Sequence, residues 1–90
     1  MEQFDGLTRS DVAILEVLVT NMGRILSRTS LLQSAGMETM SERRCDASLV
    51  TLRRVLGPES IITVRRRGWM LSENALVTAM TLLAAVADKL

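Results

Sequence analysis

The segment from Arg43 to Gly57, RRCDASLVTLRRVLG, has the apolar spacing of an amphipathic helix and constrains the fold more than any other stretch. At about 100° per residue, the apolar side chains fall within one narrow arc: Cys45, Leu49, Leu52 and Leu56. The opposite arc carries arginines at its ends and small or uncharged residues between them: Arg43, Ala47, Val50 and Arg54, with Arg44 and Thr51 beside them. We therefore expect a helix that ends at Gly57 and presents an arginine-flanked surface suited to a phosphate-lined groove.

A short β-hairpin is predicted directly after this helix. The segment 61–64 is rich in β-branched residues, and 69–71 is its natural partner across a turn at 65–68, where Gly68 supplies conformational freedom. The tip then carries three consecutive arginines, Arg65, Arg66 and Arg67. A solvated turn is the alternative, but three crowded cations repel one another unless they meet an anion, which favours a binding function.

Two shorter helices are predicted upstream. Thr8 and Asp11 form a capping pattern for a helix over 9–21, whose apolar positions are Val12, Leu15, Leu18, Val19 and Met22. Ser27 caps a second helix that ends at Gly36, and Arg28 stands at its N-terminus, where a phosphate is favoured; a merely solvated arginine is the alternative. In the connection 37–41, Met37 and Met40 are expected to fold back on the core; a partner-binding surface is the alternative.

A last helix is expected after Ser72 or Asn74, and it is apolar on more than one side. One face carries Leu76, Met80, Leu83, Val86, Ala87 and Leu90, and the other carries Val77, Thr81, Ala84 and Asp88. One face can pack on the domain. The other can pack on a second copy, which makes a homodimer through this helix an open possibility, or on a neighbouring domain.

The composition argues against an enzyme. The 90 residues include no His and no Tyr, so a histidine base, an imidazole metal ligand and a phenolic acid are all missing. The single Cys45 can form no intramolecular disulfide and no two-cysteine metal site, and its place in the apolar arc predicts a core thiol. We expect no catalytic residues, no cofactor and no metal site.

The chain length allows one small domain. No signal peptide is evident, and the longest uncharged run, 74–87, is shorter than the ~20 residues of a membrane span, so we expect a soluble, cytoplasmic protein with no membrane partner. The net charge is only +1, but residues 42–71 hold seven arginines against three acids, a net +4, while the remainder carries −3. Positive charge is therefore gathered on the predicted helix and hairpin.

The order of helix, short helix, helix and hairpin resembles a winged helix-turn-helix. The stretches LTRSDVAILEVLVTNMGRILSRTSLL, RRCDASLVTLRRVLG and ITVRRRGWML resemble the C-terminal effector domain of OmpR/PhoB-type transcriptional regulators, over about Leu7 to Leu71. The resemblance implies a mainly α fold with a small β-hairpin, and a DNA-binding module of a bacterial response regulator. We accordingly divide the chain into an entry tail (1–6, with Phe4 as a candidate core contact), a winged-helix domain (7–71) and a C-terminal helix for packing or dimerisation (72–90).

The resemblance also implies roles for individual residues. Segment 43–56 matches the recognition helix that enters the major groove of double-stranded DNA, and 65–68 matches the wing. Arg43 and Arg44 match residues that contact the DNA backbone, and Arg28 lies near the phosphate contacts. Arg65 matches the arginine that enters the minor groove. The groove-facing surface of the recognition helix is matched by Ala47, Val50, Thr51 and Arg54. Asp46, Leu49, Leu52, Arg53 and Leu56 match positions that serve packing and local pairing. RNA polymerase is a further implied partner, through the loop matching Met37–Ser41, which is short here.

Some positions depart from the family pattern. Val50 and Thr51 stand where basic residues are common, which removes base-reading donors but leaves methyl groups that can touch thymine. Arg66 replaces a usual glycine and Arg67 a usual apolar residue, so this wing is more basic. The four-stranded sheet that precedes the first helix in the family has no counterpart before Leu7. Either it lies in a parent protein or the last helix covers the exposed core.

Two functional alternatives stay open beside DNA binding. The winged helix can serve as a protein-interaction module, through the Val50 and Thr51 surface or the last helix. Similar domains also occur fused to other modules, including uroporphyrinogen-III synthase-like proteins, so the chain can also be a regulatory appendage of a larger protein of that kind.

Overall fold

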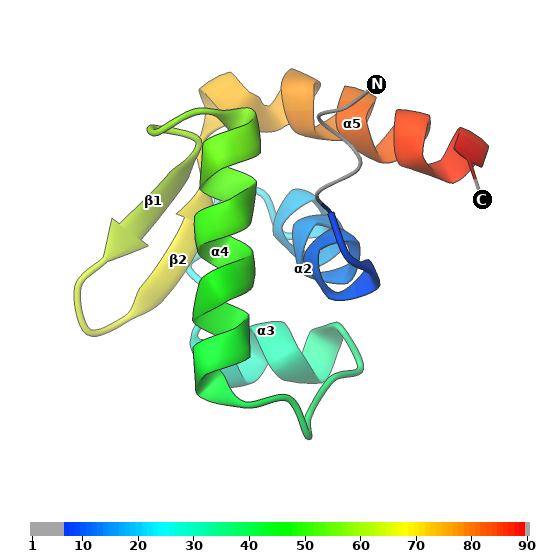
Figure 1. Ribbon diagram of the computed structural model, residues 1–90. Helices are drawn as coiled ribbons and strands as arrows, with labels where there is room; N and C mark the ends of the chain where they lie inside the picture. Colours follow the sequence, from blue (N-terminus) through cyan, green and yellow to red (C-terminus); the bar gives the residue numbers. More distant parts are fainter. Residues whose placement is uncertain (1–6, 90) are drawn as a thin grey trace.

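The computed structural model describes residues 7–89, and the side chains of residues 7–86. Its elements follow one another as α2 (Arg9–Thr20), α3 (Arg28–Ser34), α4 (Glu42–Leu56), β1 (Ile61–Val64), β2 (Gly68–Leu71), the 3-10 turn η1 (Glu73–Ala75) and α5 (Leu76–Lys89). Figure 1 shows α4 beside the hairpin, with α3 near its N-terminal end and α5 beyond its C-terminal end. The predicted entry tail with Phe4, the side chains of Ala87 and Asp88, and Leu90 lie outside the described residues.

The helix α2 begins where the capping pattern predicts. The Thr8 hydroxyl accepts a hydrogen bond from the Asp11 backbone N–H (3.1 Å), and the Thr8 N–H donates to the Asp11 carboxylate (3.0 Å). The buried face is wider than the sequence prediction, because Ile14 and Val17 are buried together with Leu15 and Leu18. The predicted Val12, Val19 and Met22 are only half-buried. The reason is that α2 packs against α3, α4 and α5, so that more than one stripe of it is covered.

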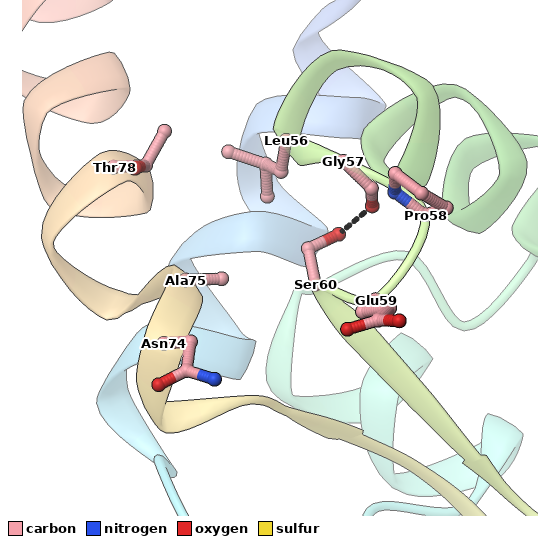
Figure 2. A pocket seen from close by; sticks show the side chains of 8 residues that line it. All are labelled: Leu56, Gly57, Pro58, Glu59, Ser60, Asn74, Ala75 and Thr78. Atoms are coloured by element: carbon pink, nitrogen blue, oxygen red, sulfur yellow. Dashed lines mark hydrogen bonds between the residues drawn. The ribbon is translucent and has the colours of Figure 1, made fainter.

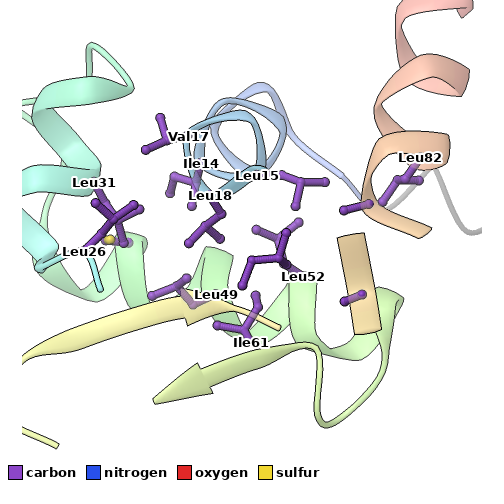
Figure 3. Close-up of a cluster of buried hydrophobic side chains, with 14 of the residues drawn as sticks. Ile14, Leu15, Val17, Leu18, Leu26, Leu31, Leu49, Leu52, Ile61 and Leu82 are labelled. Carbon is purple, nitrogen blue, oxygen red and sulfur yellow. The ribbon is translucent and has the colours of Figure 1, made fainter. Parts of the chain in front are cut away.

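The core is aliphatic and is centred on α2, as Figure 3 shows. α4 contributes Cys45, Leu49 and Leu52 to it, as its spacing predicts, and Leu56 packs against it half-buried. Met37 and Met40, from the loop after α3, are also half-buried against this cluster, which confirms that they fold back on the core. The loop before α4 is therefore held down by its own methionines.

The hairpin pairs Ile61 with Leu71 and Val64 with Gly68, so its loop consists of the three residues 65–67. Gly68 is thus the first residue of β2, with φ +140°, and not part of the loop. The hairpin is tied to the rest of the fold at Trp69, whose backbone N–H and C=O exchange hydrogen bonds with Leu26 (2.9 and 2.8 Å). Leu26, in the segment between α2 and α3, therefore acts as a one-residue third strand.

The helix α5 packs on the domain with a face that overlaps the predicted one only in part. Leu76, Leu83 and Val86 of the predicted face are half-buried against the core, but Met80 is 53% exposed. The buried residues are instead Ala79 and Leu82, together with Ala75 of the preceding η1. The face is rotated because a helix that is apolar on several sides does not specify which one is covered, and the small Ala79 allows a close approach to α2. The opposite face, with Val77, Thr81 and Ala84, is exposed as predicted.

Within residues 7–89, no helix combines the length and the apolar character that a bilayer-spanning segment requires.

Candidate nucleic-acid interface

The outward surface of α4 is the first part of the candidate interface. Ser41 caps the helix by accepting a hydrogen bond from the Arg44 N–H (3.1 Å), and Gly57 ends it with φ +118°. With Cys45, Ser48, Leu49 and Leu52 buried, the remaining side is left to solvent. This surface consists of the exposed residues Arg43, Arg44, Ala47, Val50 and Arg54, together with the half-buried Thr51.

The hairpin loop is the second part. Arg65, Arg66 and Arg67 are all exposed, and the loop closes with a hydrogen bond from the Arg67 N–H to the Val64 carbonyl (2.9 Å). Arg66 has φ +67°, which is uncommon for a residue other than glycine. The three cations are therefore held on a tight tip.

Arg53 joins these two parts. Its guanidinium Nη2 donates to the Ile61 carbonyl (2.9 Å) and to the Thr63 hydroxyl (2.8 Å), both in β1. A single side chain of α4 thereby fixes the position of the neighbouring strand. This confirms the local pairing role that the resemblance implies for Arg53. Although Arg53 is adjacent to Arg54 in sequence, its side chain stabilises the contact between α4 and β1.

Arg28 connects three elements. Its Nε and Nη2 donate to the two carboxylate oxygens of Asp46 on α4 (3.0 and 3.1 Å), and its Nη1 lies 3.8 Å from a Glu42 oxygen. The guanidinium carbon lies 5.3 Å from the centre of the Trp69 ring on β2, which allows a cation–π contact. The hydrogen bonds that Arg28 donates to Asp46 raise the pKa of Arg28 above its usual value.

A groove of about 420 Å³ lies between the hairpin and the N-terminal ends of α3 and α4. It is lined by Ser27, Arg28, Thr29, Glu42, Thr63, Val64, Arg66, Arg67, Gly68 and Trp69. Of the predicted contact residues, the structure thus brings Arg28, Arg66 and Arg67 around one hollow. Arg65 and the outward surface of α4 lie outside its lining, on the two elements that flank it.

The predicted arginines differ in how they are engaged. Arg28 is held by carboxylates, although its side chain remains 33% exposed. The other six form no ion pair with a described residue: Arg43, Arg44, Arg54, Arg65, Arg66 and Arg67. Their charge is available to an external anion, whereas that of Arg28 is partly neutralised.

Among the described residues, no arginine-lined groove of this kind lies at the C-terminal end of α4. Figure 2 shows a hollow of about 240 Å³ between the end of α4, the loop to β1 and the start of α5. Glu59 is the single ionisable residue of its lining, and the hydrogen bond inside it, from the Ser60 hydroxyl to the Gly57 carbonyl, only closes the turn. This hollow therefore offers no pair of groups for acid–base or nucleophilic chemistry.

Cys45 has the environment of a core thiol. It is fully buried, and this burial, followed by the nearby Asp46 carboxylate, raises the pKa of the thiol. The described residues also contain no group of three or more His, Cys, Asp or Glu side chains placed to hold a metal ion. The chemistry of the surface is thus that of charge and hydrogen bonding.

Two features of this region have no direct signal in the sequence. Arg28 and Asp46 lie 18 positions apart on different helices, so that no periodicity links them. The Leu26–Trp69 pairing is likewise long-range, and no local pattern indicates it. Arg28 was expected near phosphates, but its partner was not foreseen.

A family model described as "Transcriptional regulatory protein, C terminal" matches residues 5–71. The chain belongs to this family. As a transcriptional regulatory protein C-terminal domain it is a DNA-binding domain of a transcriptional regulator, and its helices and two-stranded hairpin form a winged helix-turn-helix, as predicted. The family is one of DNA-binding regulatory domains, not of enzymes. A comparison with curated proteins found no match.

Proposed function

We propose that the domain binds duplex DNA with α4 in the major groove and the wing, residues 65–68 (the hairpin loop and Gly68), in the adjacent minor groove. The observation that carries this proposal is the set of six exposed arginines without a described carboxylate partner, gathered on two neighbouring elements. Arginine side chains of this kind neutralise phosphates and bind base edges. DNA binding also fits the cytoplasmic location expected from the sequence.

Individual roles follow from the positions of the side chains. Arg43 and Arg44, in the first turn of α4, contact phosphates, while Ala47, Val50, Thr51 and Arg54 face the bases. Arg65 enters the minor groove, and Arg66 and Arg67 contact the phosphates beside it. Arg28 adds a phosphate contact through the exposed third of its side chain, in an orientation that Asp46 fixes.

The test is the salt dependence of binding to duplex DNA, measured by fluorescence anisotropy at several salt concentrations. If about five phosphates are neutralised, log K should fall with log salt at a slope of about −4 to −5. A slope near zero would contradict the proposal.

Variants sharpen this test. Arg54→Ala and Arg65→Ala should each weaken binding and make the salt slope shallower by up to about one unit, with folding intact. Arg24→Ala is the matched control, because Arg24 is an exposed arginine outside the proposed surface and removes the same charge. Equal losses in all three variants would indicate a general charge effect and not an interface.

We further propose two partners for the same domain. A second copy can cover the exposed face of α5, where Val77 is 74% exposed. RNA polymerase can contact the loop 37–41, of which the exposed Glu38 and Thr39 are the accessible part. Sedimentation velocity across a range of concentrations distinguishes monomer from dimer directly.

A second candidate function is a protein-interaction module, which includes a regulatory appendage of a larger, uroporphyrinogen-III synthase-like protein. The observation that favours it is the exposure of aliphatic side chains at Val50 (55%) and Val77 (74%). Under this alternative, Arg54→Ala and Arg65→Ala leave partner binding unchanged. The DNA titrations of these two variants therefore separate the candidates.

A further inference from the structure

The middle of the α4 surface is aliphatic. Val50 is 55% exposed, whereas the other large aliphatic side chains of α4 are buried or half-buried. Ala47, on the same surface, lies three positions before Val50 and four positions before the half-buried Thr51, and residues three or four positions apart adjoin on a helix. These three side chains expose methyl groups, and the Thr51 hydroxyl is their sole polar group. We call them the methyl patch.

Arginines lie on both sides of the methyl patch along the helix. Arg43 and Arg54 are eleven residues apart, which corresponds to about 16 Å at a rise of about 1.5 Å per residue. This distance matches roughly five base pairs of B-DNA, at about 3.4 Å per pair. When Arg43 and Arg54 both contact phosphates or the polar edges of bases, the methyl patch faces the two or three base pairs between them.

The chemical groups that each base presents in the major groove determine which bases are favoured at these positions. In the major groove, guanine, cytosine and adenine present hydrogen-bond donors and acceptors, whereas thymine also presents its 5-methyl group. Val50 can pair with none of the polar groups, so a polar edge under it would lose water without gaining a partner. A thymine methyl instead packs against the valine methyls and removes apolar surface of both from water.

We infer that the methyl patch selects thymine in the central base pairs contacted by α4, with Val50 as the specificity-determining residue. The inference rests on the proposed placement of α4 in the major groove and adds to it the class of sequence that is bound. The flanking arginines provide affinity for DNA, and the methyl patch discriminates between bases by contacting the thymine methyl group.

The experiment begins with a pool of 30-base-pair duplexes that carry a randomised centre, from which the 90-residue chain selects its preferred sequences. In a selected duplex, each thymine is then replaced singly by uracil, which removes only the 5-methyl group. At one or two central positions this replacement should weaken binding about four-fold, the ratio for about 0.8 kcal/mol per buried methyl-sized group at 25 °C. Val50→Ala should weaken binding to the thymine duplex and bind thymine and uracil duplexes equally.

Ile25→Ala serves as the control, since it shortens an exposed aliphatic side chain, 37% exposed, in the segment before α3 and outside the proposed interfaces. It should keep the full uracil penalty. Val50 and Ile25 are both exposed, so neither variant removes a core side chain, and circular dichroism verifies that each is folded.

Three results would overturn the inference while leaving DNA binding intact: selected centres without thymine, no uracil penalty at any position, or a penalty that persists in Val50→Ala. If the chain binds no duplex of the pool in a salt-dependent manner, the proposed function itself is refuted, and this inference with it.

Discussion

Gly68 is the residue at which the hairpin meets the rest of the fold. Its φ of +140° is open to glycine and to almost no other residue, and a Cβ at this position would overlap the backbone carbonyl of Leu26. The close approach exists because Leu26 pairs with the next residue, Trp69. A hydrogen atom as side chain is therefore a condition for tying the hairpin to the segment before α3.

Gly68→Ala should lower the free energy of unfolding by about 3 kcal/mol or more, because overlap with backbone adds to an unfavourable φ. Gly36→Ala is the matched control. Gly36 also has a positive φ, +72°, but a Cβ there would meet no atom within 4 Å, so that only the backbone conformation costs free energy, about 1 kcal/mol. Urea unfolding of both variants measures the difference, and equal losses would show that the contact with Leu26 is unimportant.

Arg28 and Arg54 show that the charge of a residue does not fix its role. Both are predicted to contact DNA, but the Arg28 guanidinium also has two hydrogen bonds to Asp46 and lies over Trp69, while Arg54 has no ion pair with a described residue. The difference arises from the helix on which each lies and from the side chains opposite it. Such pairings form only when the chain is folded.

At the scale of elements, caps and periodicity predict a helix well when one stripe is apolar. α4 begins after Ser41 and ends at Gly57, and its single apolar stripe placed Cys45, Leu49 and Leu52 correctly in the core. The capping pair Thr8 and Asp11 likewise located the start of α2. These signals are local, so they can be read without knowing the fold.

The face of α5 could not be obtained in this way. Nearly every position from Leu76 to Val86 is apolar or small, so several faces fit the same spacing, and the choice is made by the shape of α2. The candidate interface, too, could be predicted from the sequence only in part. Its exposed α4 residues followed from the helical wheel, but the Arg28 cluster and the groove beside it depend on contacts between distant segments.

Two substitutions on α5 test which face is buried. Leu82→Ala should lower the free energy of unfolding by about 2–4 kcal/mol, because Leu82 is 3% exposed and its loss leaves a cavity. Met80→Ala, at a side chain that is 53% exposed, should change it by less than about 0.5 kcal/mol. Thermal or urea unfolding of dilute protein measures both values. The reverse order would mean that the face predicted from the sequence was correct after all.

At the scale of the whole molecule, few side chains can make stability depend on pH between neutral and mildly alkaline conditions, because the chain has no His, no Tyr and a single Cys. Burial raises the pKa of Cys45 in the folded state above its usual value of about 8.5. Below that pH the thiol is protonated in both states and stability is unaffected. Above it, the unfolded chain loses the proton while the folded chain keeps it, so stability falls as the pH rises.

The free energy of unfolding should therefore decline as the pH rises above about 8.5, by up to about 1.4 kcal/mol per pH unit. Cys45→Ala should lack this component, and the difference between the two proteins isolates the thiol from all other titrating groups. Urea unfolding at a series of pH values provides the measurement. Parallel curves for the two proteins would show that Cys45 ionises as easily in the folded state as in the unfolded chain.

The pairing of Leu26 with both backbone groups of Trp69, together with the Arg53 contacts to β1, fixes the hairpin to the helices at two points. In the proposed complex the spacing between α4 and the loop arginines is therefore largely set before DNA arrives. The duplex has to bend or narrow its grooves to match that spacing. Sequences with easily deformed base steps are then favoured over stiff ones, even at positions that no side chain touches.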